Sequence, residues 1–278
     1  MPTYAFFQVD VFGSNGLDGN PLAVVHDAEG IDATQMQQFA RWTGLSETTF
    51  LLPPTTDEAD YRVRIFTTEE ELPFAGHPTL GSAYAWLGAG GRPQAPNVVV
   101  QQCGAGLVRL RRDSGRLAFA APPLTRFEPV EEELVGRIAS GLGLDRQDIL
   151  DASWLVNGPR WIGIRLPSAE RVLDVRPDPG PLAGLDIGLV GPYPPGSETT
   201  YEVRALLPGQ AVAEDPVTGS LNAGLAYWMT EVGLVPDHYV ASQGTVLGRA
   251  GRVHIDREDG TIWVGGRVAD VIQGHVTI

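Results

Sequence analysis

The stretch AEDPVTGSLNAGLAYWM, Ala213–Met229, decides how the chain is interpreted, because a stretch of similar design lies half a chain earlier. That second stretch is LPFAGHPTLGSAYAWL, Leu72–Leu87. When His77 is aligned with Asp215, the two share Pro, Gly and Ser at three further positions of a [HD]-P-x-x-G-S element. The offset is 215 − 77 = 138 residues, close to half of the 278 residues. The pattern predicts two copies of one unit.

Each copy runs from a β-type segment through a Pro and Gly turn into an apolar run at helical spacing. The β-type segments are YRVRIF from Tyr61 and YEVRAL from Tyr201, at an offset of 201 − 61 = 140. A small polar residue and Pro before an apolar run predict a helix start, which exposes unpaired amides and can hold a carboxylate. We expect the two starts to face one cleft about a pseudo-twofold axis, with His77 and Asp215 at equivalent positions.

The length of 278 residues exceeds the usual size of one domain, so two domains are expected. We place them at 1–122 and 123–278, with APPL at 121–124 as the linker, and with a return of the last strand to the first domain as an alternative. Strands around one long apolar helix in each half predict an α+β fold, in which a curved, mostly antiparallel sheet or barrel surrounds a central helix. The regular βαβ alternation of a doubly wound sheet is missing.

Composition excludes several classes of function. A formal charge of −14 speaks against nucleic acid and anionic membranes as partners. No basic leader and no run of about 18 apolar residues is present, and the one cysteine, Cys103, suits a reducing compartment, so a cytoplasmic protein is expected. Dinucleotide, P-loop and metal-ligand spacings are all absent, which favours chemistry without a cofactor or metal.

Several local elements follow from short patterns. Asp32–Thr43 is predicted to be a helix capped by Asp32 and ended by Gly44. A second helix is predicted over Pro129–Leu142, and two or three strands over 98–120. Pro177–Pro195 is rich in Pro and Gly and receives no assignment.

Three side chains are candidates for moving protons. His77 and Asp215 lie at the predicted helix starts, and Glu47 precedes the apolar strand Thr48–Leu52. Taken singly, Asp215 reads as a helix cap, His77 as a packing residue and Glu47 as part of a solvated turn. Together, a His and two carboxylates in a desolvated cleft can act as general acids and bases.

Four motifs in order, GNPLAVV, GLSETTFLL, LPFAGHPTLGSA and EDPVTGSLNAGLA, resemble those of the PhzF family of phenazine biosynthesis isomerase-like proteins. The resemblance covers essentially the full chain. It implies the diaminopimelate epimerase-like fold of two similar domains with an active site at their junction. The namesake enzyme of the family isomerises trans-2,3-dihydro-3-hydroxyanthranilate by proton transfer, without metal or organic cofactor.

The resemblance also assigns roles to residues. It implies that Glu47 is the acid–base residue and that His77 and Asp215 are its catalytic partners. The residues that it implies hold substrate are Ser46, Gly76, Gly219 and Ser220. Epimerases of the same fold use a pair of cysteines, whereas Cys103 lies far from these motifs in the sequence.

The sequence therefore predicts an isomerase that moves a proton on a small cyclic or amino-acid-like carboxylate. A carboxylate-based amino-acid epimerase or lyase, and a non-catalytic binding protein on the same scaffold, stay open. The expected partners are a small anionic substrate and a second copy of the chain in a homodimer.

Overall fold

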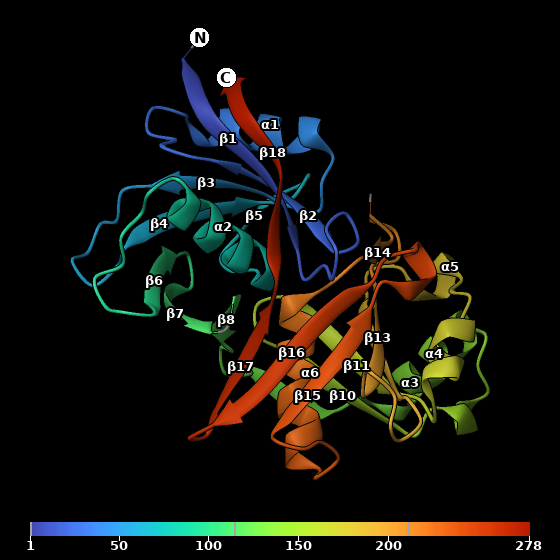
Figure 1. Ribbon diagram of the computed structural model, residues 1–278. Helices are drawn as coiled ribbons and strands as arrows, with labels where there is room; N and C mark the ends of the chain where they lie inside the picture. Colours follow the sequence, from blue (N-terminus) through green and yellow to red (C-terminus); the bar gives the residue numbers. More distant parts are fainter. Residues whose placement is uncertain (1, 114, 211) are drawn as a thin grey trace. The chain divides into compact units, whose positions relative to one another are not determined.

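The computed structural model describes residues 1–278 except Met1, Ser114 and Ala211. The chain forms two compact units (Figure 1). Unit 1 contains Met1–Ala120 and Gly265–Ile278, and unit 2 contains Ala121–Val264. The division falls at the start of the APPL segment, and the end of the chain belongs to unit 1 because its last strand pairs with the first.

Unit 1 is built on one continuous row of strands. Strand β18 pairs with β1, and the row continues through β2, β3, β4, β6 and β7 to β8, with the short β5 beside β4. The β2–β3 and β4–β6 pairs are parallel and the others antiparallel. The bounds are β1 Thr3–Val11, β2 Asn20–Val25, β3 Thr48–Leu52, β4 Tyr61–Phe66, β5 Glu71–Leu72, β6 Val98–Cys103, β7 Gly106–Asp113, β8 Arg116–Ala120 and β18 Val268–Thr277.

Two helices pack on this sheet. Helix α1, Ala33–Thr43, has a capping box between Asp32 and Gln35 and ends at Gly44 with φ 67°, so the predicted helix is confirmed at both ends. Helix α2, Gly76–Gly88, packs on β1 and β2 and is buried along most of its length. A Cβ at Gly81 would lie 2.5 Å from Leu22 Cδ2, so glycine allows the helix to approach the sheet closely there.

Unit 2 repeats this plan. The row runs β9, β10, β11, β12, β13, β15 and β16, with the short β14 beside β13. The β11–β12 and β13–β15 pairs are parallel, matching β2–β3 and β4–β6 of unit 1. The bounds are β9 Arg126–Pro129, β10 Asp151–Val156, β11 Arg160–Arg165, β12 Asp186–Pro192, β13 Tyr201–Leu206, β14 Glu214–Asp215, β15 His238–Gln243, β16 Gly251–Glu258 and β17 Thr261–Gly266.

Helix α6 of unit 2, Gly219–Glu231, packs on β10 and β11 as α2 packs on β1 and β2. The remaining helices of unit 2 are α3 Glu132–Leu142, α4 Ala169–Asp174 and α5 Pro179–Leu182, with the short 3₁₀ turns η1 Arg146–Asp148 and η2 Thr245–Leu247. The predicted α+β fold, with a central helix in each half, is confirmed.

Some of the locally predicted elements differ from those in the structure. The helix predicted over Pro129–Leu142 begins later, at Glu132, because Pro129 ends β9 and pairs with Ser153. The unassigned segment 177–195 forms α5 and the central strand β12. Two or three strands were expected over 98–120, and three are present, β6, β7 and β8. In the described part of the chain, no helix is both long and apolar enough to cross a membrane.

The predicted equivalence of His77 and Asp215 is wrong. His77 is the second residue of α2, whereas Asp215 lies on β14, four residues before α6 begins. Both helices have 13 residues, and their starts are 219 − 76 = 143 residues apart. At that offset His77 corresponds to Ser220. The offset grows from 140 at β4 and β13 because the connection to the next short strand is longer in unit 2.

Candidate active site

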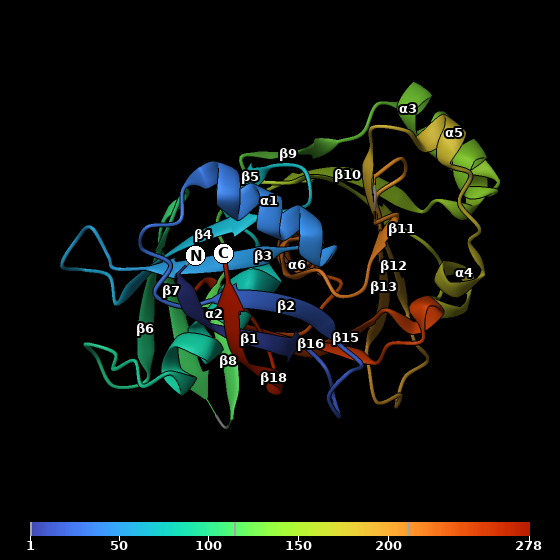
Figure 2. The same cartoon turned by 90° about the horizontal axis from the view of Figure 1, so that it is seen from above.

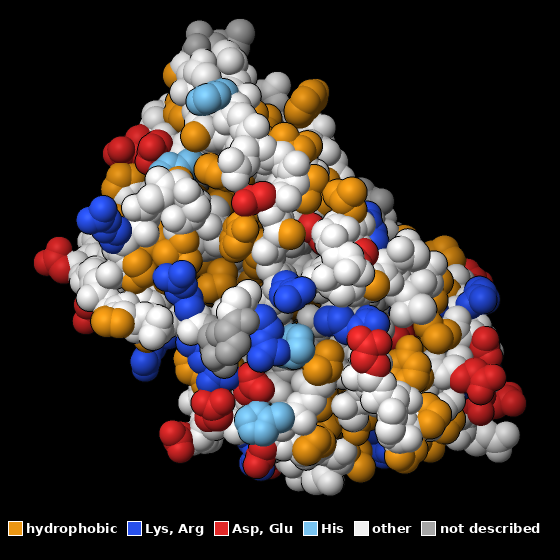
Figure 3. Space-filling view, in the orientation of Figure 1, with side chains coloured by type: hydrophobic (Ala, Val, Ile, Leu, Met, Phe, Trp, Pro, Cys, Tyr) orange, Lys and Arg blue, Asp and Glu red, His pale blue; other side chains and the backbone are white. Residues whose placement is uncertain are grey.

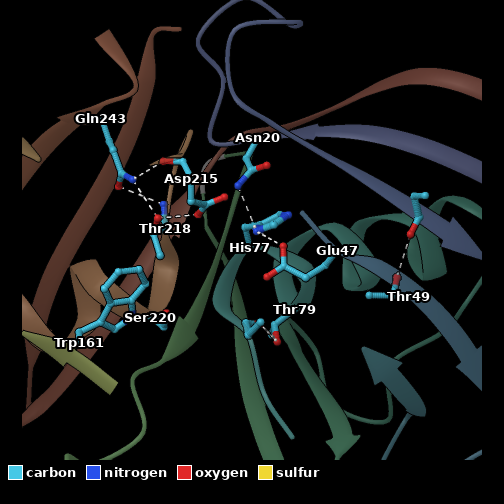
Figure 4. A network of polar contacts seen from close by, with 12 residues as sticks. Asn20, Glu47, Thr49, His77, Thr79, Trp161, Asp215, Thr218, Ser220 and Gln243 are labelled. Carbon is cyan, nitrogen blue, oxygen red and sulfur yellow. Dashed lines mark hydrogen bonds and ion pairs between the residues drawn. The ribbon is translucent and has the colours of Figure 1, made fainter. Parts of the chain in front are cut away.

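In unit 1 the predicted residues gather at the start of α2 (Figure 4). Glu47 lies in the connection between α1 and β3, and its Oε2 is 3.5 Å from Nδ1 of His77. The same ring nitrogen lies 3.3 Å from the amide nitrogen of Asn20, the first residue of β2. Three segments that are distant in sequence therefore meet at one imidazole.

The His77 ring is neutral. It is 3% exposed, and burial lowers its pKa to about 3, although a hydrogen bond with the Pro21 backbone acts in the opposite direction. The contact with Glu47 therefore joins a carboxylate to a neutral imidazole, so it is not an ion pair despite the short distance. Within the described protein, Nε2 of the ring is buried without a hydrogen-bond partner. This nitrogen is available to a bound molecule.

The start of α2 is held by buried side chains. The hydroxyl of Thr79 donates to the carbonyl of Ala75, the residue before the helix, and accepts from the Gln101 amide at 2.9 Å. Tyr61 in turn donates to Gln101 at 2.8 Å. No side chain caps the helix at Ala75, so the amides of its first turn stay open to an anion. Gly76 supplies the first of them.

In unit 2 Asp215 lies at the centre of a polar network before α6 (Figure 4). It is 7% exposed, and the Thr218 hydroxyl donates to its Oδ2 at 2.5 Å. The Gln243 amide donates to the Thr218 hydroxyl at 2.9 Å and to the Asp215 carbonyl at 3.1 Å. Because Gln243 uses the acceptor side of the hydroxyl, Thr218 must direct its proton to the carboxylate. The network fixes the orientation of Asp215.

Ser220 is the second residue of α6 and is 4% exposed. The indole Nε1 of Trp161 donates to its hydroxyl oxygen at 3.1 Å, and the Asn157 amide donates to its carbonyl at 2.8 Å. Because an indole can only donate, the proton of the Ser220 hydroxyl is left to point toward another acceptor. As at α2, no side chain caps the helix, and Gly219 presents an amide of the first turn.

The structure thus brings Glu47, His77 and Gly76 together in unit 1, and Asp215, Gly219 and Ser220 together in unit 2. Ser46 lies beside Glu47, partly buried. Cys103 ends β6, and burial raises the pKa of its thiol, which lowers the fraction present as the reactive thiolate. Among the described residues no group of three His, Cys, Asp or Glu side chains is placed to hold a metal ion.

Sequence reasoning missed five side chains that shape these two clusters: Asn20, Asn157, Trp161, Thr218 and Gln243. A signal existed for Asn20, which belongs to the GNPLAVV motif, and for Thr218, which belongs to EDPVTGS. Gln243 had none, because its role depends on the parallel pairing of β15 with β13.

Two sheets of one pattern, each carrying a long helix with an open start, define the class of proteins with the diaminopimelate epimerase-like fold. Within that class, the profile of the PhzC-PhzF family, described as phenazine biosynthesis-like protein, matches residues 9–274, and the chain belongs to this family.

Named relatives agree with this assignment. The chain is 34% identical to "Antisense-enhancing sequence 1" of Schizosaccharomyces pombe, over 99% of each chain. It is 32% identical to trans-2,3-dihydro-3-hydroxyanthranilate isomerase of Pseudomonas chlororaphis, over 87% of this chain and 86% of the relative. A solved structure described as a predicted epimerase from Pseudomonas aeruginosa superimposes with a TM-score of 0.81 at 26% identity, covering 99% of each chain.

Proposed function

We propose that the protein is a cofactor-independent isomerase of the kind named among its relatives, which moves a proton between two carbons of a small ring that bears a carboxylate and an amine. The observation that carries the proposal is the contact of Glu47 with the buried, neutral His77 at the open start of α2. A carboxylate there can accept a proton from a bound substrate, and the neutral imidazole adds no positive charge that would weaken it as a base.

The reaction is balanced within the substrate. Glu47 removes a proton from an activated carbon, and the electron pair of that C–H bond forms a new double bond to the neighbouring carbon. The pair of the existing double bond shifts to its far carbon, which takes the proton back from Glu47. No redox partner is required. The Glu47 side chain is 15% exposed, so bulk water has limited access to the proton that it carries.

The other residues of the site would bind the substrate and orient it. Amides at the starts of α2 and α6, from Gly76 and Gly219, suit a carboxylate. Asp215, fixed by Thr218, suits the amine, and the Ser220 hydroxyl can donate to a substrate oxygen.

The test uses trans-2,3-dihydro-3-hydroxyanthranilate in deuterium oxide, followed by NMR. An isomerase changes the position of the double bonds or introduces deuterium at carbon, whereas a binding protein does neither. Glu47→Gln keeps the size of the side chain and removes the base, so we expect turnover to fall by about 10²- to 10⁴-fold while substrate binding largely survives.

Glu58→Gln is the matched control, because Glu58 is exposed in a turn of the same unit and should leave turnover unchanged. Full activity of the Glu47 variant would remove Glu47 from the mechanism. Deuterium incorporated at an amino-acid α-carbon without isomerisation would instead support an epimerase.

A further inference from the structure

Asn20 is a buried side chain to which the proposed reaction assigns no role. It is the first residue of β2 and is 0% exposed, and its amide nitrogen lies 3.3 Å from Nδ1 of His77 (Figure 4). The carboxylate of Glu47 approaches the same ring nitrogen at 3.5 Å. A donor and an acceptor therefore compete for one nitrogen, and the position of the ring proton decides which of them forms the hydrogen bond.

The backbone before Asn20 is held firmly. Figure 2 shows β2 beside β1, and in this ladder Asn20 pairs with Val11. The buried carboxylate of Asp10 accepts the backbone amide of Gly19 with both oxygens, at 3.1 and 3.0 Å. A Cβ at Gly19 would lie 2.2 Å from the carbonyl oxygen of Val11, so the chain approaches itself closely at this point. The Asn20 side chain therefore reaches His77 from a fixed base.

The Glu47 carboxylate favours the observed orientation of the Asn20 amide. A half-turn of that amide would place its carbonyl oxygen against Nδ1 of His77, beside a carboxylate that already approaches this nitrogen. With the amide nitrogen there, a donor lies near the negative charge instead. An amide nitrogen can only donate, so Nδ1 of the neutral ring accepts and the ring proton is on Nε2.

We propose that Asn20 is a positioning residue that sets the tautomer of His77, so that a nitrogen lone pair, not an N–H group, faces Glu47. This role rests on the proposed function, in which Glu47 is the base. A hydrogen bond donated to a carboxylate stabilises its charged form and weakens it as a base. By keeping the ring proton on Nε2, Asn20 prevents the ring from donating such a bond to Glu47. The ring does not compete for the substrate's proton, because burial lowers its pKa to about 3.

Nitrogen-15 NMR of the full chain, labelled at histidine and measured at neutral pH, tests the tautomer directly. All five histidines lie in the described part of the chain, and His77 alone is buried. Figure 3 shows other histidine side chains at the surface. The signals of the buried ring are identified by their loss in His77→Gln. We expect a protonated Nε2 and a bare Nδ1, and a native ring protonated at Nδ1 would overturn the proposal.

Asn20→Leu keeps the approximate shape of the side chain and removes the donor. The Glu47 carboxylate then faces Nδ1 without that competitor, so we expect the ring proton to move to Nδ1. Turnover of trans-2,3-dihydro-3-hydroxyanthranilate should fall about 10- to 100-fold, the effect of one hydrogen bond to a charged group. Asn157→Leu is the matched control, since Asn157 is 5% exposed and its amide donates to the Ser220 carbonyl. It should keep the ring proton on Nε2.

Asn20→Asp gives a second measurement if the leucine variant does not fold, because a carboxylate in that place can only accept from Nδ1. A ring proton that stays on Nε2 in these variants, as in the control, would overturn the role of Asn20. A proton that moves to Nδ1 while kcat stays at the native value would overturn the effect on Glu47. If the native protein leaves the substrate unchanged, the proposed function fails, whereas the NMR spectrum still decides the tautomer.

Discussion

The two helix starts share a scaffold and differ in their chemistry. In each unit a 13-residue helix without a side-chain cap begins four residues after a two-residue strand. A buried glutamine from the strand paired in parallel braces each start, Gln101 in unit 1 and Gln243 in unit 2. At the second helical position, however, unit 1 has His77 and unit 2 has Ser220. The two units therefore share an uncapped helix start and differ in the side chain at its second position.

The same contrast appears in an ion pair that both units contain. Arg64 and Glu71 link β4 to β5, and Arg204 and Glu214 link β13 to β14, each pair with two hydrogen bonds. The side chains of the first pair are 28% and 42% exposed, and those of the second are 3% and 11% exposed. Arg204 also donates to two carbonyls at the end of α4. The two ion pairs therefore have the same hydrogen bonds, but only the pair in unit 2 is buried.

The largest expected effect is on this pair. Arg204→Met should lower the free energy of unfolding by about 3–5 kcal/mol, because it leaves a buried carboxylate and two carbonyls uncompensated. Arg64→Met should cost only about 0–1 kcal/mol, since water replaces the lost partner. Urea unfolding of both variants checks the difference. If the two variants lose similar free energy of unfolding, burial does not change the contribution of this ion pair to stability.

The second prediction concerns pH, because only unit 1 carries a titrating residue at the second helical position. His77 has a pKa of about 3 in the folded protein against about 6.5 when unfolded. Its contribution to stability is complete above pH 6.5 and is lost as the pH falls toward 3, at up to about 1.4 kcal/mol for each pH unit. His77→Gln should remove this part of the pH dependence.

Unfolding measured at pH 7.5 and at pH 5 gives the comparison. Between these values we expect the native protein to lose about 2 kcal/mol more than the variant. The control is His238→Gln, since the side chain of His238 is 65% exposed. If the native protein and the His77 variant respond identically to pH, the buried imidazole is not neutral in the folded state.

How much the sequence could predict depended on the range of the interactions. Helix α1 was predictable at both ends because Asp32, Gln35 and Gly44 act within a few residues. The general fold followed from the repeated pattern, but the predicted equivalence of His77 and Asp215 was wrong. It rested on shared letters in HPTLGS and DPVTGS, and Ser82 in fact lies in the middle of α2, where it donates to Thr49, whereas Ser220 lies at a helix start.

The site residues show the same limit. Glu47 has no distinctive local pattern, and its assignment came from resemblance to a family. Its contact with His77 joins segments 30 positions apart in sequence (77 − 47 = 30). The braces formed by Gln101 and Gln243 depend on parallel strand pairing, which leaves no periodic signal in a single sequence.

The smallest expected effect tests the corrected alignment of the two helices. At the offset of 143, Gly81 of α2 corresponds to Gly224 of α6, and both face strands. A Cβ at Gly81 would lie 2.5 Å from Leu22 and 3.0 Å from Val11, whereas a Cβ at Gly224 would lie 3.0 Å from Leu155. Overpacking costs about 1–3 kcal/mol, and replacing a helical glycine with alanine returns about 1 kcal/mol.

Gly81→Ala should therefore destabilise the protein by about 1 kcal/mol or somewhat more, and Gly224→Ala should be close to neutral. Thermal or urea unfolding resolves a difference of this size. Because the two glycines occupy the same step of equivalent helices, the contrast measures how closely each helix approaches its own sheet. A destabilisation confined to Gly224→Ala would reverse the order of the two contacts and would show that α6, not α2, is the more tightly packed of the pair.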